Sequence, residues 1–192
     1  MFKVMQKAGV KLEAQHYTMG MSSLARSKFW SDACRLLDQM PKATVQRNII
    51  NFNTAISSCE KGNQWQQAID LFGSACEETH PDVITYSAVI SACEKALRWQ
   101  QAFSLFFSMA QVKVLPNVIS YSAVISSSGK AEQWQLSLAT FEAMLHAKVR
   151  PNVVAYNATI SSCEKARAWQ QACHILEDMP KAKVKRDPRI NC

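Results

Sequence analysis

The sequence lacks the side-chain groupings from which most enzyme active sites are built. It has only five glycines, and they form no glycine-rich segment that could hold a phosphate group. Its four histidines, His16, His80, His146 and His174, hold no common place in the repeat described below. Paired carboxylates and a Ser/His/Asp set are missing as well. We therefore expect no enzymatic activity, no metal and no cofactor; an enzyme would need a catalytic domain outside this sequence.

Seven cysteines are present, but no Cys-x-x-Cys pair or Cys/His cluster has the spacing of a zinc site. Cys59, Cys93 and Cys163 recur at one place in the repeat, where other units carry Ser128 and Leu24. A position that accepts Ser and Leu is typical of a small packing group. The odd number of cysteines favours a reducing compartment.

Long hydrophobic runs are also absent, so no segment is expected to cross a membrane. The N-terminus has neither a signal peptide nor an Arg/Ser-rich transit segment. Charge is unbalanced, with 22 basic and 15 acidic residues and a net charge of +7, which favours a polyanionic partner. The excess is uneven, because residues 49–82 carry one lysine against five carboxylates.

The chain does contain a repeated sequence motif of nine residues. Residues 117–125 read NVISYSAVI, and related phrases occupy residues 48–56, 82–90 and 152–160. A tryptophan follows each phrase, and all five tryptophans lie on one ladder at spacings of 35, 34, 35 and 35 residues: Trp30, Trp65, Trp99, Trp134 and Trp169. A constant period of this length is typical of stacked helical repeats.

Each repeat contains two apolar stripes at helical spacing. In residues 83–117 the first stripe is Tyr86, Val89, Ile90 and Cys93, and the second runs from Trp99 to Met109. Asp82 stands where a helix N-cap is expected. Pro116 marks the connector to the next unit, because proline cannot continue a helix. The pattern predicts an all-α protein of helix-turn-helix repeats.

The pattern divides the chain into five units and two remnants. The units are residues 14–48 (degenerate), 49–82 (one residue short), 83–117, 118–152 and 153–187. Residues 1–13 match the tail of a preceding unit, and residues 188–192 are too few for a capping helix. Stacked arrays need polar end caps, so we expect this sequence to be a piece of a longer array or a truncated gene model.

The unit resembles the pentatricopeptide repeat. Residues 153–179 show the motif most fully, with Val153, Tyr156, Asn157, Ile160, Cys163, Lys165, Ala172 and Met179. The resemblance covers residues 14–187, and it departs from the family where tryptophan opens the second helix. It implies a right-handed α-solenoid that binds single-stranded RNA, with one base per repeat.

The resemblance assigns base reading to the small polar residue directly after each aromatic: Thr18, Asn53, Ser87, Ser122 and Asn157. It assigns the same role to the residue that closes each unit: Asn48, Asp82, Asn117, Asn152 and Asp187. By themselves the first set also fits a solvated face, and the second fits simple helix capping. Both alternatives stay open at this point.

The family pairs the two positions of one unit to select a base. Thr18 with Asn48 implies adenine, and Asn53 with Asp82 implies uracil. Ser87 with Asn117 and Ser122 with Asn152 imply adenine, and Asn157 with Asp187 implies uracil. The implied site is 5′-AUAAU-3′, with its first and last letters weakened by Arg47 and Arg186 in place of the connector proline.

Two further sets recur. One basic residue ends each first helix, where it fits either the helix dipole or an RNA phosphate: Arg26, Lys61, Lys95, Lys130 and Lys165. A β-branched residue opens four first helices, where it fits either packing between repeats or the family's sandwiching of a base: Ile50, Ile84, Ile119 and Val154. The tryptophans fit packing of the second helix on the first better than base stacking.

The predicted partner is therefore single-stranded RNA, with other proteins of an RNA-processing complex as possible additional partners and no membrane. The resemblance implies a role in organellar RNA processing, stability, editing or translation, in the chloroplast or the mitochondrion. The competing hypothesis is a protein-binding scaffold of the tetratricopeptide type, because concave solenoid surfaces also bind peptides.

Overall fold

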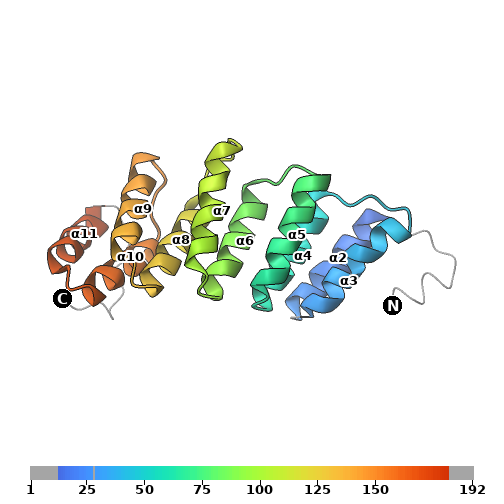
Figure 1. Ribbon diagram of the computed structural model, residues 1–192, viewed down its shortest axis with the longest axis horizontal. Coiled ribbons are helices and arrows are strands. Elements are labelled where there is room, and N and C mark those ends of the chain that lie inside the picture. Colours follow the sequence, from blue (N-terminus) through green and yellow to red (C-terminus); the bar gives the residue numbers. More distant parts are fainter. Residues whose placement is uncertain (1–12, 28, 182–192) are drawn as a thin grey trace. The chain divides into compact units, whose positions relative to one another are not determined.

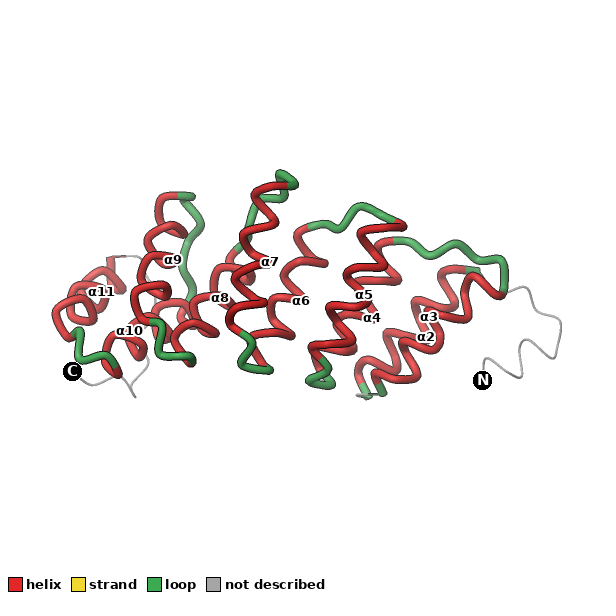
Figure 2. The backbone as a smooth tube through the Cα atoms, in the orientation of Figure 1, coloured by secondary structure: helices red, strands yellow, loops and turns green. Residues whose placement is uncertain are grey.

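The computed structural model describes residues 13–27 and 29–181, and every regular element in those two segments is an α-helix (Figures 1 and 2). In chain order the helices are α2 (Ala14–Arg26), α3 (Trp30–Lys42), α4 (Ile49–Lys61), α5 (Trp65–Glu78), α6 (Val83–Lys95), α7 (Trp99–Gln111), α8 (Val118–Lys130), α9 (Trp134–His146), α10 (Val153–Lys165) and α11 (Trp169–Lys181). The predicted C-terminal remnant and all but the last residue of the N-terminal one lie outside this description.

The chain forms two compact units, residues 1–92 and residues 93–192, with the division inside α6. In the first unit α2 packs on α3, α4 packs on α5, and α4 also lies against α2 and α3. In the second unit α8 packs on α9 and α10 on α11, while α8 contacts α7 and α10 contacts both α8 and α9. Each hairpin therefore buries its apolar stripes against itself and against the next hairpin of its unit.

The aromatic residue in the first turn of each first helix lies in the core. Its exposed fraction never exceeds 6%, at Tyr17, Phe52, Tyr86, Tyr121 and Tyr156. In three cases it meets a phenylalanine of the preceding hairpin edge to face. The ring centroids are 4.8 Å apart for Phe72 and Tyr86, 5.0 Å for Phe106 and Tyr121, and 5.1 Å for Phe141 and Tyr156. Such pairs contribute roughly 0.5–1.5 kcal/mol beyond the area they bury, so they fix the register of neighbouring repeats.

The repeated cysteines are packing groups, as predicted. Cys59, Cys93 and Cys163 are fully buried. Burial raises the pKa of the Cys93 thiol to about 11, because a thiolate would be poorly solvated there. Within the described residues no group of three or more His, Cys, Asp or Glu side chains could hold a metal ion.

The tryptophans also lie mainly in packing positions. Four of the five are half-buried, and only Trp169 is largely exposed. Trp134 packs on the core of its unit. Trp30 reaches the C-cap of α4, where a Cβ added to Gly62 would lie 2.5 Å from its indole Cδ1. These tryptophans thus pack their second helix against the first helix of the same repeat or of the next repeat.

The second predicted unit accommodates its missing residue at the end of its second helix. Helix α5 runs to Glu78, and α6 begins at Val83, whereas α7 ends at Gln111 and α8 begins only at Val118. Three longer connectors contain a left-handed residue, namely Thr44, Lys113 and Lys148. Thr79 is instead extended, and its hydroxyl donates to Ala75 O at 2.8 Å. The deletion therefore removes the left-handed turn and leaves both helices intact.

None of the helices in the described segments is long and apolar enough to span a bilayer.

The tight turns inside the second to fifth hairpins each place one non-glycine residue in the left-handed region: Asn63, Leu97, Glu132 and Arg167. Asparagine tolerates this conformation, but leucine is strained in it by roughly 1 kcal/mol. Leu97 has φ 58° and is 62% exposed, so its side chain gains little from packing.

We therefore expect Leu97→Asn to raise the free energy of unfolding by about 0.5–1 kcal/mol, as measured by urea denaturation. The matched control is Val112→Asn, because Val112 is 56% exposed and has a φ of −94°. A stabilisation of the same size in both variants would trace the gain to the loss of exposed apolar surface, and would contradict the role of strain.

Candidate nucleic-acid interface

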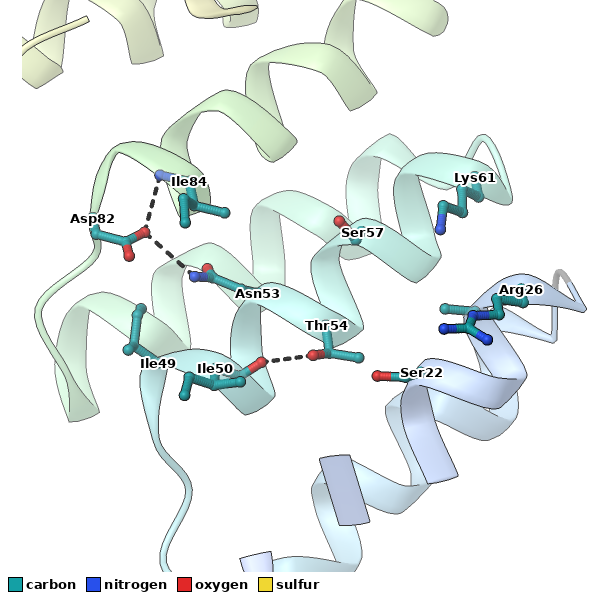
Figure 3. A pocket seen from close by; sticks show the side chains of 11 residues that line it. Ser22, Arg26, Ile49, Ile50, Asn53, Thr54, Ser57, Lys61, Asp82 and Ile84 are labelled. Carbon is teal, nitrogen blue, oxygen red and sulfur yellow. Dashed lines mark hydrogen bonds between the residues drawn. The ribbon is translucent and has the colours of Figure 1, made fainter. Parts of the chain in front are cut away.

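A groove in the first unit brings together four of the predicted sets. We call it groove 1; its volume is about 440 Å³. It is lined by Ser22, Ala25, Arg26, Ile49, Ile50, Asn53, Thr54, Ser57, Lys61, Asp82 and Ile84. Figure 3 shows Asp82, Asn53 and Ile84 toward one end of this groove and Arg26 and Lys61 toward the other. A side chain from each of the predicted base-reading, sandwiching and phosphate sets therefore lines one surface.

The two base-reading residues of the second repeat are in direct contact. Asn53 Nδ2 donates to Asp82 Oδ1 at 3.3 Å (Figure 3). The same oxygen caps α6 by accepting from Ile84 N at 3.0 Å and from Thr85 N at 2.9 Å, and it also accepts from the Thr85 hydroxyl. The structure thus brings together two residues that are far apart in the sequence, because the cap of one helix reaches the preceding first helix.

Asp82 is poised as a charged acceptor. Partial burial raises the pKa of the Asp82 carboxyl, but the hydrogen bonds from Thr85, Asn53 and Ile84 outweigh it and hold the pKa below its ordinary value. All the hydrogen bonds that the structure gives to this side chain end on Oδ1. Oδ2 is left to accept from a ligand.

In the fourth repeat the cap residue also contacts the preceding first helix, but this cap is an amide, so its free group is a donor and not an acceptor. Asn152 Oδ1 accepts from Ala155 N at 2.9 Å and lies 3.1 Å from Ser122 Oγ. Because the backbone N–H fixes which end of the amide is the oxygen, the Nδ2 group of Asn152 is left to donate. An Asp cap therefore presents an acceptor, and an Asn cap presents a donor.

The two serines of the first base-reading set differ from the expectation that they contact a base directly. Ser87 is 4% exposed and Ser122 is 6% exposed. Each hydroxyl donates at 2.6 Å to the carbonyl four residues earlier, Val83 O or Val118 O. A hydroxyl has a single proton, so little donor capacity remains for a base. In the fourth repeat, Asn152 is more exposed than Ser122.

In the degenerate first repeat, the two predicted residues Thr18 and Asn48 both bond to Asn51. Asn48 caps α4 by accepting from Asn51 N at 3.0 Å. Thr18 Oγ1 instead accepts from Asn51 Nδ2 at 2.7 Å and donates to Ala14 O. Asn51 is therefore the residue that links the cap to the preceding helix here, and the sequence pattern did not single it out.

The remaining members of the two sets are placed as follows. Asn117 caps α8 by accepting from Ile119 N at 2.9 Å and Ser120 N at 3.0 Å. Asn157 is half-buried and lines the second groove described below. Asp187 lies outside the described residues.

The sandwiching set is exposed. The exposed fraction is 59% for Ile50, 59% for Ile84, 53% for Ile119 and 55% for Val154. These fractions exclude packing between repeats as the main role of the four side chains. Exposed apolar β-branched residues at the same position of four repeats favour contact with an apolar ligand surface such as the face of a base.

A second groove in the second unit has a related composition. Groove 2 has a volume of about 390 Å³ and is lined by Ser126, Gly129, Lys130, Val154, Asn157, Ala158, Ser161, Ser162 and Lys165. It again combines a predicted base-reading residue, a β-branched residue and cations. Neither groove is lined by a tryptophan.

The predicted phosphate-binding residues are all exposed at the ends of first helices. Arg26 and Lys61 line groove 1, and Lys130 and Lys165 line groove 2. Lys95 lies in the last turn of α6. Lys130 differs from the sequence-based expectation because it forms an ion pair with Glu94.

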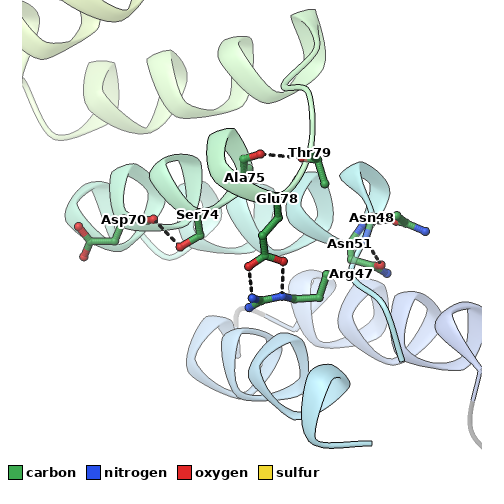
Figure 4. Close-up of polar contacts among 8 residues, drawn as sticks. All are labelled: Arg47, Asn48, Asn51, Asp70, Ser74, Ala75, Glu78 and Thr79. Atoms are coloured by element: carbon green, nitrogen blue, oxygen red, sulfur yellow. Dashed lines mark hydrogen bonds and ion pairs between the residues drawn. The ribbon is translucent and has the colours of Figure 1, made fainter. Parts of the chain in front are cut away.

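Arg47 replaces the connector proline without disturbing the cap that follows it. Its guanidinium pairs with both carboxylate oxygens of Glu78 (Figure 4) and lies 5.4 Å from the ring centroid of Phe52. Asn48 still caps α4 next to it (Figure 4). The ion pair and the ring contact thus restrict the conformation of this connector, as the rigid ring of proline does in other connectors.

Several solved structures share this fold. The crystal structure of the pentatricopeptide repeat protein PPR10 from maize matches with a TM-score of 0.71 and 19% identity, over 97% of this chain and 27% of that chain. PPR10 in complex with an 18-nt psaJ RNA element matches with a TM-score of 0.76 and 21% identity, over 96% of this chain and 30% of that chain. The chain thus spans about a quarter to a third of the length of PPR10.

A third similar structure is the PPR domain of Arabidopsis thaliana protein-only RNase P 1 in complex with tRNA. It has a TM-score of 0.78 and 13% identity, over 88% of this chain and 90% of that chain. At these identities the likeness establishes the fold alone, and it confirms the predicted all-α solenoid class.

The sequence itself matches family models, although no curated protein matches it. The model described as "PPR repeat" matches residues 16–45 and 50–78, and "PPR repeat family" matches residues 81–130. "Pentatricopeptide repeat domain" matches residues 128–166 and 141–187. Because these matches together cover most of the sequence, the chain belongs to the pentatricopeptide repeat family.

Proposed function

We propose that the chain binds single-stranded RNA and reads one base per repeat, as part of organellar RNA processing, stability, editing or translation. The observation that carries the proposal is groove 1, where the Asn53–Asp82 pair lies beside exposed Ile50 and Ile84 and shares one surface with Arg26 and Lys61. Two of the similar solved structures, PPR10 and the PPR domain of protein-only RNase P 1, are themselves complexes with RNA.

Base selection follows from the atom that each cap leaves free. The Oδ2 atom of Asp82 can accept from the N3–H of uracil, which is the donor on that base's pairing edge. The Nδ2 group of Asn152 can donate to N1 of adenine, which is an acceptor. The cap oxygen is spent on the next helix in both cases, so the side-chain type alone sets the polarity offered to the base.

The other two sets supply affinity without sequence information. Ile50 and Ile84 come from successive first helices and line the same groove, so a base inserted between them would be covered on both faces. Lys61 lies eight residues after Asn53 on α4, or about 12 Å along the helix, which separates the base from its phosphate. Each phosphate contact made by the basic set would add about 0.7 to the steepness of the log–log salt slope.

The proposed target core is 5′-AUAAU-3′, read by the five residue pairs in chain order. Chloroplast or mitochondrial location rests on family membership. Titration against RNA that contains this core and against a scrambled RNA of equal length, followed by fluorescence anisotropy, tests the proposal. Binding that ignores sequence, or no binding, would favour the protein-binding scaffold instead.

The second repeat gives a direct test of base selection. We expect Asn53→Ser to move the preference at the second base from uracil toward guanine, because Asp82 remains while the amide beside it is lost. Anisotropy with four RNAs that differ only at this base measures the shift. Asn63→Ser, in an exposed turn outside the groove, is the control. An unchanged preference would show that Asn53 does not face the second base.

The phosphate-binding set can be tested by charge removal. The double variant Lys61→Ala, Lys165→Ala should weaken binding to all sequences equally and flatten the salt slope by about 1.4, or about 0.7 per lost phosphate contact. The control removes the same charge from exposed connector residues, Lys113→Ala with Lys148→Ala. Equal slopes for the two double variants would remove Lys61 and Lys165 from the RNA path.

Asp82 links base reading to stability. Its pKa is held below the ordinary value, so the stabilisation by the charged form is present at neutral pH and is lost as the pH falls through the folded-state pKa. Because the carboxyl is partly exposed, solvent screening reduces this contribution, and because Asn also caps helices, we expect Asp82→Asn to lower the free energy of unfolding at pH 7 by only about 0.3 kcal/mol. The difference from the wild type should shrink below about pH 4.

Urea denaturation at pH 7, 5 and 3 measures this difference. Asp38→Asn, at an exposed position of α3, serves as the control. A difference between wild type and Asp82→Asn that stays constant down to pH 3 would mean that the carboxylate charge makes no contribution to the cap.

A further inference from the structure

Glu94 is a carboxylate in contact with one of the cations that the RNA proposal assigns to phosphate. Glu94 lies in the last turn of α6, and its Oε1 accepts from Ser126 Oγ at 2.8 Å and forms an ion pair with Lys130 Nζ. The Glu94 side chain is only 16% exposed, whereas that of Lys130 is 47% exposed. The serine fixes the carboxylate, and the carboxylate holds the lysine.

The next hairpin lacks this carboxylate. Gly129 occupies the place that Glu94 holds one repeat earlier, and Lys165 occupies the place of Lys130. A Cβ on Gly129 would lie 3.2 Å from Ala158 O and 3.2 Å from Ser162 Cβ, so the approach of α8 to α10 leaves little room for a side chain. Lys165 has no ion pair with any residue that the structure describes.

We propose that Glu94 is a positioning residue that acts through Lys130: it holds this lysine away from RNA phosphate and so lowers the sequence-independent affinity of the array. Lys165, which faces Gly129, keeps its full capacity to bind phosphate. This inference rests on the RNA-binding function proposed above. The residues discussed there strengthen RNA binding, whereas Glu94 weakens it.

The physical reason is a competition between two anions for one cation. A phosphate that approaches Lys130 must displace a carboxylate that is mostly buried and already hydrogen-bonded, so it neutralises no additional charge. Each phosphate that gains a lysine releases counterions and adds about 0.7 to the steepness of the salt slope. Lys165 therefore adds its full share, and Lys130 adds little while Glu94 is present.

The test uses Glu94→Gln in the full chain. The amide keeps the size of the side chain and an oxygen for Ser126, but it loses the charge. We expect binding to both 5′-AUAAU-3′ RNA and a scrambled RNA to become tighter by the same factor. The salt slope should steepen by about 0.7, so that raising the salt from 50 to 200 mM weakens this variant about 2.6-fold more than the wild type.

Two comparisons separate a role through Lys130 from the simple loss of a negative charge. The double variant Glu94→Gln, Lys130→Gln should return to the wild-type slope, because no lysine is released. Glu164→Gln removes the same charge at the equivalent place of the fifth repeat, at an exposed residue without a described ion pair, and should leave the slope unchanged. Thermal unfolding confirms that each variant is folded, and Glu94→Ala replaces Glu94→Gln if it is not.

The outcomes are distinct for the two proposals. Failure of the wild type to bind RNA would overturn the RNA-binding function itself. Normal binding by the wild type with an unchanged slope in Glu94→Gln would overturn only the role of Glu94. An equally steep slope in the double variant, or in Glu164→Gln, would also overturn it, because the effect would then not pass through Lys130.

Discussion

The structure depends on the side-chain oxygen that caps each first helix. At Asn48, Asp82, Asn117 and Asn152 this oxygen accepts from free backbone N–H groups in the first turn of the next helix. In the second and fourth repeats it also meets the preceding first helix, through Asn53 or Ser122. The same oxygen atom therefore caps a helix and holds the predicted base-reading residues in position. A change that weakens this cap would destabilise the fold and would also disturb the proposed base recognition.

The packing that surrounds the cap serves the same end. The edge-to-face pairs between Phe72 and Tyr86, Phe106 and Tyr121, and Phe141 and Tyr156 join each second helix to the following first helix. The residue directly after the aromatic is then held next to the core instead of projecting freely into solvent. Ser87 and Ser122 are almost buried for this reason, whereas the caps Asn117 and Asn152 are more exposed.

In both grooves a carboxylate accompanies the cations, although the chain as a whole carries a net positive charge. Groove 1 combines Asp82 with two cations, and Lys130 in groove 2 is paired with Glu94. An array that binds by phosphate contacts alone would prefer no base sequence. Under the proposed function, Asp82 and Glu94 would reduce this sequence-independent contribution, so that a larger share of the binding free energy would come from the caps and the apolar side chains beside them.

The sequence by itself determined the class of fold, because a tryptophan period of 35, 34, 35 and 35 residues and apolar stripes at helical spacing are local properties of the chain. It also placed the caps, since Asn or Asp before an apolar helix start is a short-range signal. Only the tertiary structure decided that Ile50, Ile84, Ile119 and Val154 are exposed, that Thr18 meets Asn51, and that Glu94 holds Lys130. These contacts join residues on successive hairpins, and their distances depend on how closely two helices pack, which no spacing within one repeat specifies.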